Sequence, residues 1–287
     1  MKTNSKTRLI VDSGSTKTDW ALVGSDGTLL ATFQTEGINP VHQSDDTIMC
    51  VLNKAKALCP SAGSTVESIH FYGAGLIEPK RPLMVRLLTE AFGEARSIEA
   101  ENDLLGAARA LCGRHEGIAA ILGTGANSCL YDGRRIVQNT PPLGYILGDE
   151  GSGAVLGRLF LNALFKGVLP QEMRNDYLTS AGITYADVIQ RVYREPQANR
   201  FLASTSLYIC AHVGESEALQ ELVTDNFRQF FRRNIVPYGR RDLAVNVVGS
   251  IASHYEPYLR QAAEAEGFSL GTVSQSPMQG LLSFHGQ

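Results

Sequence analysis

The chain has 287 residues, of which 44% are hydrophobic and 19% are charged, which is typical of a globular protein with one large domain or two medium ones. Its formal net charge of −3 provides no basic surface for nucleic acid and no polybasic face for a membrane. Both are therefore excluded as predicted partners, and a small molecule is favoured. The five cysteines are scattered without a C-x-x-C pair, which predicts reduced thiols. The start has no apolar stretch long enough for a signal peptide or a membrane span, which predicts a cytoplasmic protein.

The first predicted elements are three antiparallel strands. We expect them at residues 9–11, 20–24 and 28–33. The Asp26-Gly27 pair between the last two is a strong hairpin signal because this dipeptide adopts the turn that two paired strands require.

The turn between the first two strands is small and rich in hydroxyl groups. It reads Asp12-Ser-Gly-Ser-Thr-Lys-Thr18. Gly14 lets the backbone approach a ligand, and backbone N–H groups with the hydroxyls of Thr16 and Thr18 can bind phosphate oxygens. The carboxylate of Asp12 repels phosphate unless a cation lies between them, which predicts a ligand of nucleotide-bound Mg²⁺. An Asp that only accepts a local hydrogen bond in a hairpin turn is the alternative.

Helices then alternate with strands. The predicted elements are helices at 45–58 and 81–93, strands at 68–72 and 97–100, and a helix from Asp103 to about residue 113. This alternation predicts an α/β fold with partly parallel strands. By itself, Asp103 is most simply a helix cap.

The opening pattern recurs after residue 117. A strand at 118–122 leads into Gly123-Thr-Gly-Ala-Asn127, and strands at 129–131 and 135–138 follow, again joined by Asp-Gly. A dinucleotide fingerprint is excluded because a hairpin rather than a helix follows the glycines. Two turns that bind phosphates from opposite sides need two domains that face one cleft, so the repeat predicts a two-domain protein.

The rest of the chain contains a glycine loop, a helical region and another glycine turn. The loop at 148–153 precedes an apolar helix at 154–165. Four helices are expected at 170–180, 184–194, 197–213 and 215–235, without a recognisable functional motif. A strand at 242–248, a helix at 253–266, a strand at 269–274 and a short helix from residue 277 follow. The Gly249-Ser250 turn can accept a flat base because missing side chains leave room.

Four segments together carry a resemblance. In chain order they are Asp12-Ser-Gly-Ser-Thr-Lys-Thr18, Gly123-Thr-Gly-Ala-Asn127, Gly148-Asp-Glu-Gly-Ser-Gly153 and Gly249-Ser-Ile-Ala252. They resemble the first phosphate motif, the second phosphate motif, the sugar loop and the adenosine motif of the N-acetylglucosamine kinase and BadF/BadG/BcrA/BcrD ATPase family, in the superfamily of sugar kinases, actin and heat-shock chaperones. The resemblance implies two ribonuclease-H-like domains with mixed sheets around a cleft that holds ATP and Mg²⁺.

The resemblance also implies domain limits and residue roles. The first domain would span residues 1–115 and the second residues 116–287, with the last helix returning to the first domain. Asp103 would accept the proton of the sugar hydroxyl, and Asp12 would hold the metal. The nucleotide would be held by Gly14, Ser15, Thr16, Lys17, Thr18, Gly125, Asn127, Gly249 and Ser250. The sugar would be held by Asn39, Gly75, Asn102, Thr124, Gly148 and Asp149.

The expected function is an ATP-dependent kinase that converts an amino sugar, N-acetylglucosamine above others, to its 6-phosphate. One alternative is the other branch of the family. Its members are ATPases that activate acyl-CoA dehydratases or reductases and carry an iron–sulfur cluster. This chain lacks a recognisable cysteine arrangement for such a cluster, and it lacks a second motif of the Gly-Gly-Gln-Asp type. Another is a non-catalytic sugar-sensing module, which is expected to lose Asp12 or Asp103. The apolar helices of the second half are compatible with a homodimer.

Overall fold

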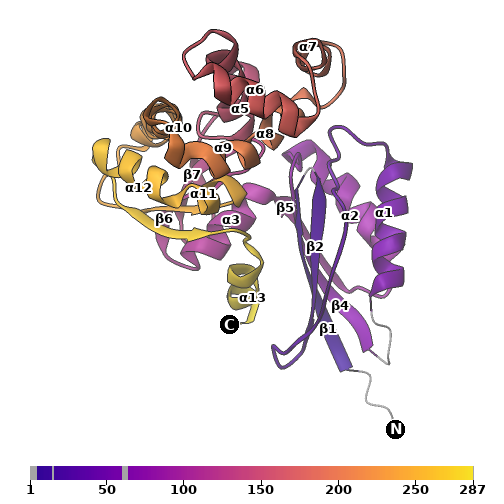
Figure 1. The fold of residues 1–287 in the computed structure, drawn as a ribbon. Helices are drawn as coiled ribbons and strands as arrows, with labels where there is room; N and C mark the ends of the chain where they lie inside the picture. Colours follow the sequence, from indigo (N-terminus) through magenta and orange to yellow (C-terminus); the bar gives the residue numbers. More distant parts are fainter. Residues whose placement is uncertain (1–4, 15, 60–63, 287) are drawn as a thin grey trace. The chain divides into compact units, whose positions relative to one another are not determined.

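Two five-stranded sheets form the framework of the protein in a computed structural model that describes residues 5–14, 16–59 and 64–286 (Figure 1). The first sheet contains β1 (Ser5–Ser13), β2 (Lys17–Gly24), β3 (Leu29–Glu36), β4 (Ser64–Gly73) and β5 (Ser97–Asn102). The second contains β6 (Glu116–Leu122), β7 (Ala126–Asp132), β8 (Ile136–Thr140), β9 (Val245–Val248) and β10 (Leu270–Ser274).

The two sheets have the same topology. Their strand orders are β3-β2-β1-β4-β5 and β8-β7-β6-β9-β10. In each sheet the first three strands are antiparallel neighbours, and the last two strands run parallel to the first. The predicted α/β fold with two mixed sheets is confirmed, and the repeat seen in the sequence is a repeat of whole sheets.

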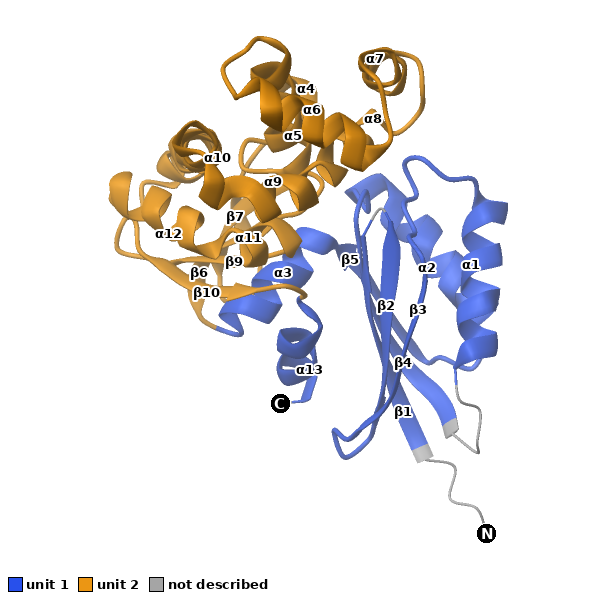
Figure 2. Cartoon of the chain, in the orientation of Figure 1, with its two compact units in different colours: residues 1–114, 277–287 blue, residues 115–276 orange. Residues whose placement is uncertain are grey.

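The chain divides into two compact units, which Figure 2 shows in different colours. Unit 1 consists of residues 1–114 and 277–287 and contains the first sheet. Unit 2 consists of residues 115–276 and contains the second sheet. The last helix, α13 (Met278–Gly286), follows β10 in the chain but belongs to unit 1.

Helices cover both faces of the sheet in unit 1. They are α1 (Asp45–Leu58), η1 (Glu78–Lys80), α2 (Arg81–Ala91), α3 (Asp103–Cys112) and α13. Alternate residues of a strand point to opposite faces, so Leu9 and Val11 pack with α1 and α2. Ile10 instead joins Tyr72 of β4 and the residues of α3 and α13 in a second cluster. Asp12, two residues after Ile10, therefore lies on the face that α3 covers.

Unit 2 is larger because a helical region separates β8 from β9. Its helices are α4 (Gly144–Leu147), α5 (Gly153–Phe165), α6 (Gln171–Ala181), α7 (Tyr185–Tyr193), α8 (Ala198–Ser204), α9 (Ser206–His212), η2 (Val213–Glu215), α10 (Glu217–Phe230), η3 (Phe231–Ile235), η4 (Val236–Tyr238), α11 (Ser250–His254) and α12 (Glu256–Ala265). Ile118, Ala120 and Leu122 of β6 pack with α5, α10 and α12 in one apolar core. Among the described residues, no helix is both long enough and apolar enough to cross a membrane.

Two predicted helices are each divided in the structure. The helix expected at 197–213 is α8 and α9, which meet at Thr205, whose hydroxyl donates to the Leu202 carbonyl at 2.8 Å. Helix α5 passes closely here, since a Cβ on Gly157 would lie 2.0 Å from the Leu202 oxygen. The helix expected at 253–266 is α11 and α12, because Pro257, which lacks a backbone N–H, stands in the first turn of α12.

Candidate functional site

The turn after β1 is held by two buried hydroxyls. Ser13 Oγ lies 2.7 Å from Thr18 Oγ1 and accepts a hydrogen bond from the N–H of Ile38 at 3.0 Å. Thr18 Oγ1 donates to the Glu36 carbonyl at 2.9 Å. Both side chains are fully buried. The hydroxyl of Thr18, expected from the sequence to contact phosphate, therefore fastens the turn to the end of β3.

Two other described residues of this turn are exposed to solvent. The N–H of Gly14 donates to the Lys17 carbonyl at 2.9 Å and closes the turn. Thr16 and Lys17 are exposed, and the Lys17 ammonium lies 2.9 Å from the Asp19 carboxylate. Ser15, also predicted to bind nucleotide, lies outside the described residues.

Asp12, at the end of β1, is surrounded by more negative charge than positive. Its neighbour in the register of β2 is Asp19, and the Asp103 carboxylate is close enough to act on its charge. Burial raises the pKa of Asp12 to about 7, and repulsion by Asp103 and Asp19 adds to this increase against a smaller opposing effect of Lys17. The neighbouring carboxylates of Asp12 and Asp103 fit a divalent cation that prefers oxygen ligands.

The junction of β5 and α3 positions Asn102 and Asp103. Asn102 is the N-cap of α3, because its Oδ1 accepts the N–H of Leu105 at 2.8 Å. The alternative of Asp103 as the helix cap is therefore wrong, since Asp103 is the first residue of the helix itself. Burial raises the pKa of Asp103 to about 6, although the backbone N–H groups of Leu104 and Asp103 oppose this increase. Such a carboxylate is ionised at neutral pH and accepts a proton more readily than an ordinary one.

The loops after β3 and β4 bring Asn39 and Gly75 together. Gly75 has a φ of +71°, and a Cβ there would lie 2.2 Å from Asn39 Oδ1. That oxygen accepts the N–H of Val41 at 3.0 Å, while the Asn39 N–H donates to Gln43 Oε1 at 2.7 Å. Glycine at 75 is required both for the backbone conformation and for the position of the Asn39 amide.

In unit 2, the turn after β6 is fastened to the start of α5. The N–H of Gly123 donates to the Gly125 carbonyl at 2.9 Å. The N–H groups of Gly153 and Ala154 donate to the carbonyls of Gly123 and Thr124 at 2.9 and 3.1 Å. Helix N–H groups that have no partner within the helix thus fix the shape of this turn.

Asn127 follows this turn on β7. Its Oδ1 accepts the N–H of Ser128 at 3.0 Å and Nδ2 of Asn139 at 2.9 Å. The amide oxygen of Asn127 is therefore held by the neighbouring strand β8.

The loop at 148–153 brings Asp149 to the same turn. Asp149 has a φ of 53°. Burial is the main cause that raises its pKa to about 6, and a hydrogen bond from the N–H of Ala126 opposes the increase. A Cβ on Gly125 would lie 3.1 Å from Asp149 Oδ2, and a Cβ on Gly148 would lie 2.1 Å from the Pro142 carbonyl oxygen. Both glycines leave the space in which this carboxylate meets the turn.

The helical region supplies residues that sequence reasoning missed. Asn226 Oδ1 accepts the N–H of Gly151 at 3.1 Å, and Asn234 Nδ2 donates to Glu150 Oε2 at 3.2 Å. Asn226 is 1% exposed, and its Nδ2 has no hydrogen-bond partner within the described chain. Asn234 lies in η3, a π-helical extension of α10. The available signal was an asparagine within the apolar stripe of α10.

The junction of β9 and α11 passes over the end of β6. Gly249 has a φ of +132°, and a Cβ there would lie 2.2 Å from the Leu122 carbonyl oxygen. Its N–H donates to the Ser274 carbonyl at 2.9 Å, and Ser250 begins α11. Gly249 therefore lies against the residue that directly precedes the Gly123 turn.

Each unit thus assembles its own set of predicted residues. Unit 1 brings Asp12 near Asp103 and places Asn39 against Gly75. Unit 2 brings Asp149 to Gly125 and places Gly249 against the end of β6.

Solved structures of other proteins show what this chain is similar to. A protein from Porphyromonas gingivalis, provisionally named an N-acetylglucosamine kinase, is 45% identical with a TM-score of 0.90, over 97% of this chain and 98% of its own. A protein from Chromobacterium violaceum with the same provisional name is 20% identical with a TM-score of 0.72, over 96% and 98%. A ROK family glucokinase from Streptomyces griseus, solved with glucose and AMPPNP, is 18% identical with a TM-score of 0.57, over 97% of each chain. No family model and no curated protein matches the chain.

The paired sheets therefore place this chain in the fold class of actin-like ATPases and sugar kinases. Because 45% identity extends over nearly the whole length, the chain belongs to the N-acetylglucosamine kinase and BadF-type ATPase family. The family predicted from the four sequence motifs is confirmed.

Proposed function

We propose that the chain is an ATP-dependent kinase that phosphorylates N-acetylglucosamine on its 6-hydroxyl. The observation that carries this proposal is the Asp103 carboxylate, held by the start of α3 near Asp12, with a pKa raised to about 6 by burial. The N-acetylglucosamine specificity is supported by the provisional name of the protein that is 45% identical.

In the proposed reaction, Asp103 accepts the proton of the sugar hydroxyl as the hydroxyl oxygen attacks the γ-phosphorus. The new O–P bond forms, the bond from phosphorus to the β,γ-bridging oxygen breaks, and ADP leaves. General-base assistance of this kind typically contributes about 10²–10⁴-fold to the rate. Burial of Asp103 makes it a stronger base than an ordinary aspartate while it stays ionised at neutral pH.

We assign the nucleotide to residues of three sequence motifs. Asp12 would hold Mg²⁺, which neutralises phosphate charge when it is bound. Phosphates would be held by Gly14, Ser15, Thr16, Lys17, Gly125 and Asn127, and the adenosine by Gly249 and Ser250. Thr18 would support the first turn from within, because its hydroxyl is buried against Ser13 and Glu36.

We assign the sugar to polar groups at the ends of loops. The set comprises Asn39, Gly75, Asn102, Thr124, Gly148 and Asp149. Amide and carboxylate groups pair with sugar hydroxyls and with an N-acetyl group. Three of these six residues, Asn39, Gly75 and Asn102, belong to unit 1, as does the proposed base Asp103. We place the reaction in the cytoplasm.

A coupled ADP-release assay tests the proposal. The purified protein is given Mg²⁺ and ATP with a panel of amino and neutral hexoses, and its iron and sulfide contents are measured anaerobically. We expect ADP release that depends on N-acetylglucosamine, with the 6-phosphate as product. Sugar-independent ATP hydrolysis with bound iron would contradict the proposal and favour an electron-transfer activator.

A further inference from the structure

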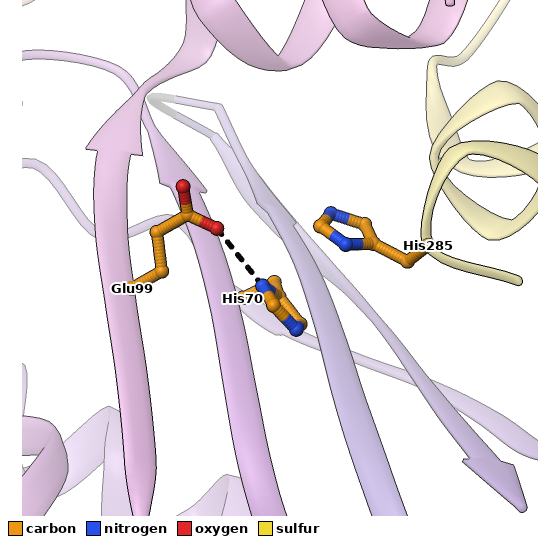
Figure 3. A group of neighbouring side chains, drawn as sticks. All are labelled: His70, Glu99 and His285. Carbon is orange, nitrogen blue, oxygen red and sulfur yellow. Dashed lines mark hydrogen bonds and ion pairs between the residues drawn. The ribbon is translucent and has the colours of Figure 1, made fainter. Parts of the chain in front are cut away.

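A polar cluster in unit 1 lies apart from the residues assigned to nucleotide and sugar. It consists of His70 in β4, Glu99 in β5 and His285 in α13, whose side chains approach one another in Figure 3. Residues that are far apart in the sequence thus offer two imidazole nitrogens and a carboxylate oxygen at one place.

The fold explains why these side chains meet. His70 and Glu99 are direct neighbours in the parallel register of β4 and β5, so they share the face of the sheet that α3 and α13 cover. Nδ1 of His70 lies 2.9 Å from Oε2 of Glu99. The ring of His285 lies above that of His70, with 3.9 Å between their centroids. One potential ligand atom from each residue lies within 4.8 Å of the other two.

We propose that His70, Glu99 and His285 bind one Zn²⁺ ion. Two histidines and one glutamate form a ligand set that zinc prefers. Tetrahedral coordination with bonds of about 2.0–2.2 Å places ligand atoms roughly 3.4 Å apart. The three ligand atoms, which now lie within 4.8 Å of one another, would move to that spacing when the ion binds. The side chains of His70 and Glu99 are 20% and 32% exposed, so water can reach the fourth coordination position.

Neighbouring groups orient the ligands. Arg109 Nη1 donates to Glu99 Oε1 at 2.8 Å and to the Tyr72 hydroxyl at 2.6 Å. That hydroxyl lies 2.8 Å from Nε2 of His285. Outer hydrogen bonds of this kind fix the ligands of metal sites. Arg109 occupies one carboxylate oxygen and leaves Oε2 for the metal, while its positive charge weakens the affinity for a cation without removing a ligand.

The bound ion would fasten α13 to two strands that end at proposed functional loops. From His70, strand β4 continues to Gly73 and the Gly75 loop, and from Glu99, strand β5 continues to Asn102. Zinc would therefore restrain the ends of these strands and the terminal helix together.

Calorimetric titration of Zn²⁺ into the chelator-treated full chain, without nucleotide, tests this site. The variants are His70→Gln and His285→Gln, which lie on different elements, so that a folding defect in one leaves the other usable. His115→Gln is the matched control, because His115 is an exposed histidine outside the cluster. Asp12→Asn is a second control, which tests whether Zn²⁺ binds at the proposed Mg²⁺ site instead. Circular dichroism checks that each variant is folded.

We expect one Zn²⁺ per wild-type chain and an increase in Tm on binding. Both cluster variants should bind Zn²⁺ at least about tenfold more weakly and lose the Tm increase. Both controls should keep the Zn²⁺ affinity and the Tm increase of the wild type. Absence of binding to the wild type would overturn the proposal. Unchanged affinity in the cluster variants would also overturn it, because thiols or another site would then hold the ion.

Discussion

The hairpin after β1 and the hairpin after β6 occupy the same place in two sheets of the same topology, yet their chemistry differs. The first follows a strand that ends in Asp12-Ser13, whereas the second follows a strand that ends in Leu122. Around the first turn, carboxylates accumulate and raise the pKa of Asp12. Around the second, glycines let backbone groups approach closely, as Gly249 does at the end of β6. A repeated scaffold thus supplies two similar turns, and the residues at the strand ends give each its own role.

Removing the carboxylate charge of the proposed base in unit 1 should have the largest effect. Asp103→Asn is expected to lower kcat by about 10²–10⁴-fold with little change in the KM for the sugar, because it removes the proton acceptor and keeps the shape. Steady-state ADP release measures this. Asp46→Asn, an exposed change in α1, is the control. Near-normal turnover by Asp103→Asn would remove this residue from the role.

Adding a methyl group to a glycine of unit 2 should have the next largest effect. Gly249→Ala places a Cβ against the Leu122 carbonyl at a positive φ, so the free energy of unfolding is expected to fall by about 1–3 kcal/mol or more. Gly123→Ala is the matched control, because no atom lies within 4 Å of a Cβ there. Chemical denaturation compares the two variants, and equal losses would contradict the steric account.

The pH dependence of catalysis sharpens the comparison further. Asp103 must be ionised to accept a proton, and burial raises its pKa to about 6. The kcat/KM for the sugar should therefore rise with pH through about 6, with about a tenfold loss one unit below that value. If kcat/KM stays constant down to the pH range in which an ordinary aspartate is protonated, this carboxylate does not act as the base.

A last effect concerns stability. Because the pKa of Asp103 is raised from 3.8 to about 6, the folded state binds its proton more tightly than the unfolded state. The tighter proton binding therefore stabilises the folded state most below about pH 4, and this contribution is lost as the pH rises through 6. Asp103→Asn should therefore be more stable than the wild type near pH 8, with a difference that disappears toward pH 4. Denaturation curves at several pH values test this, and identical curves at high pH would speak against a buried charge.

The sequence predicted the features that depend on local patterns. The strand and turn around Gly14, the repeat at Gly123 and the α/β class all follow from short apolar runs and glycine turns. Local reasoning also placed the helix start at Glu101-Asn102-Asp103, but it took Asp103 rather than Asn102 as the simplest cap. Helix breaks at Thr205 and Pro257 were missed because apolar spacing continues through them.

Features that depend on long-range contacts were not predictable in the same way. Asn226 reaches the Gly151 loop only through the packing of α10, and its apolar neighbours made it resemble part of a core. The cluster of His70, Glu99 and His285 requires strand register and the return of the last helix to unit 1. No spacing within the sequence reveals such a meeting.

Calorimetric binding of ADP to Asp103→Asn and Gly249→Ala tests the division of roles most directly. The account predicts that Asp103→Asn binds ADP with the wild-type Kd, and that folded Gly249→Ala binds it at least about tenfold more weakly, which corresponds to about 1.4 kcal/mol. Loss of ADP binding by Asp103→Asn together with wild-type affinity in Gly249→Ala would contradict the account.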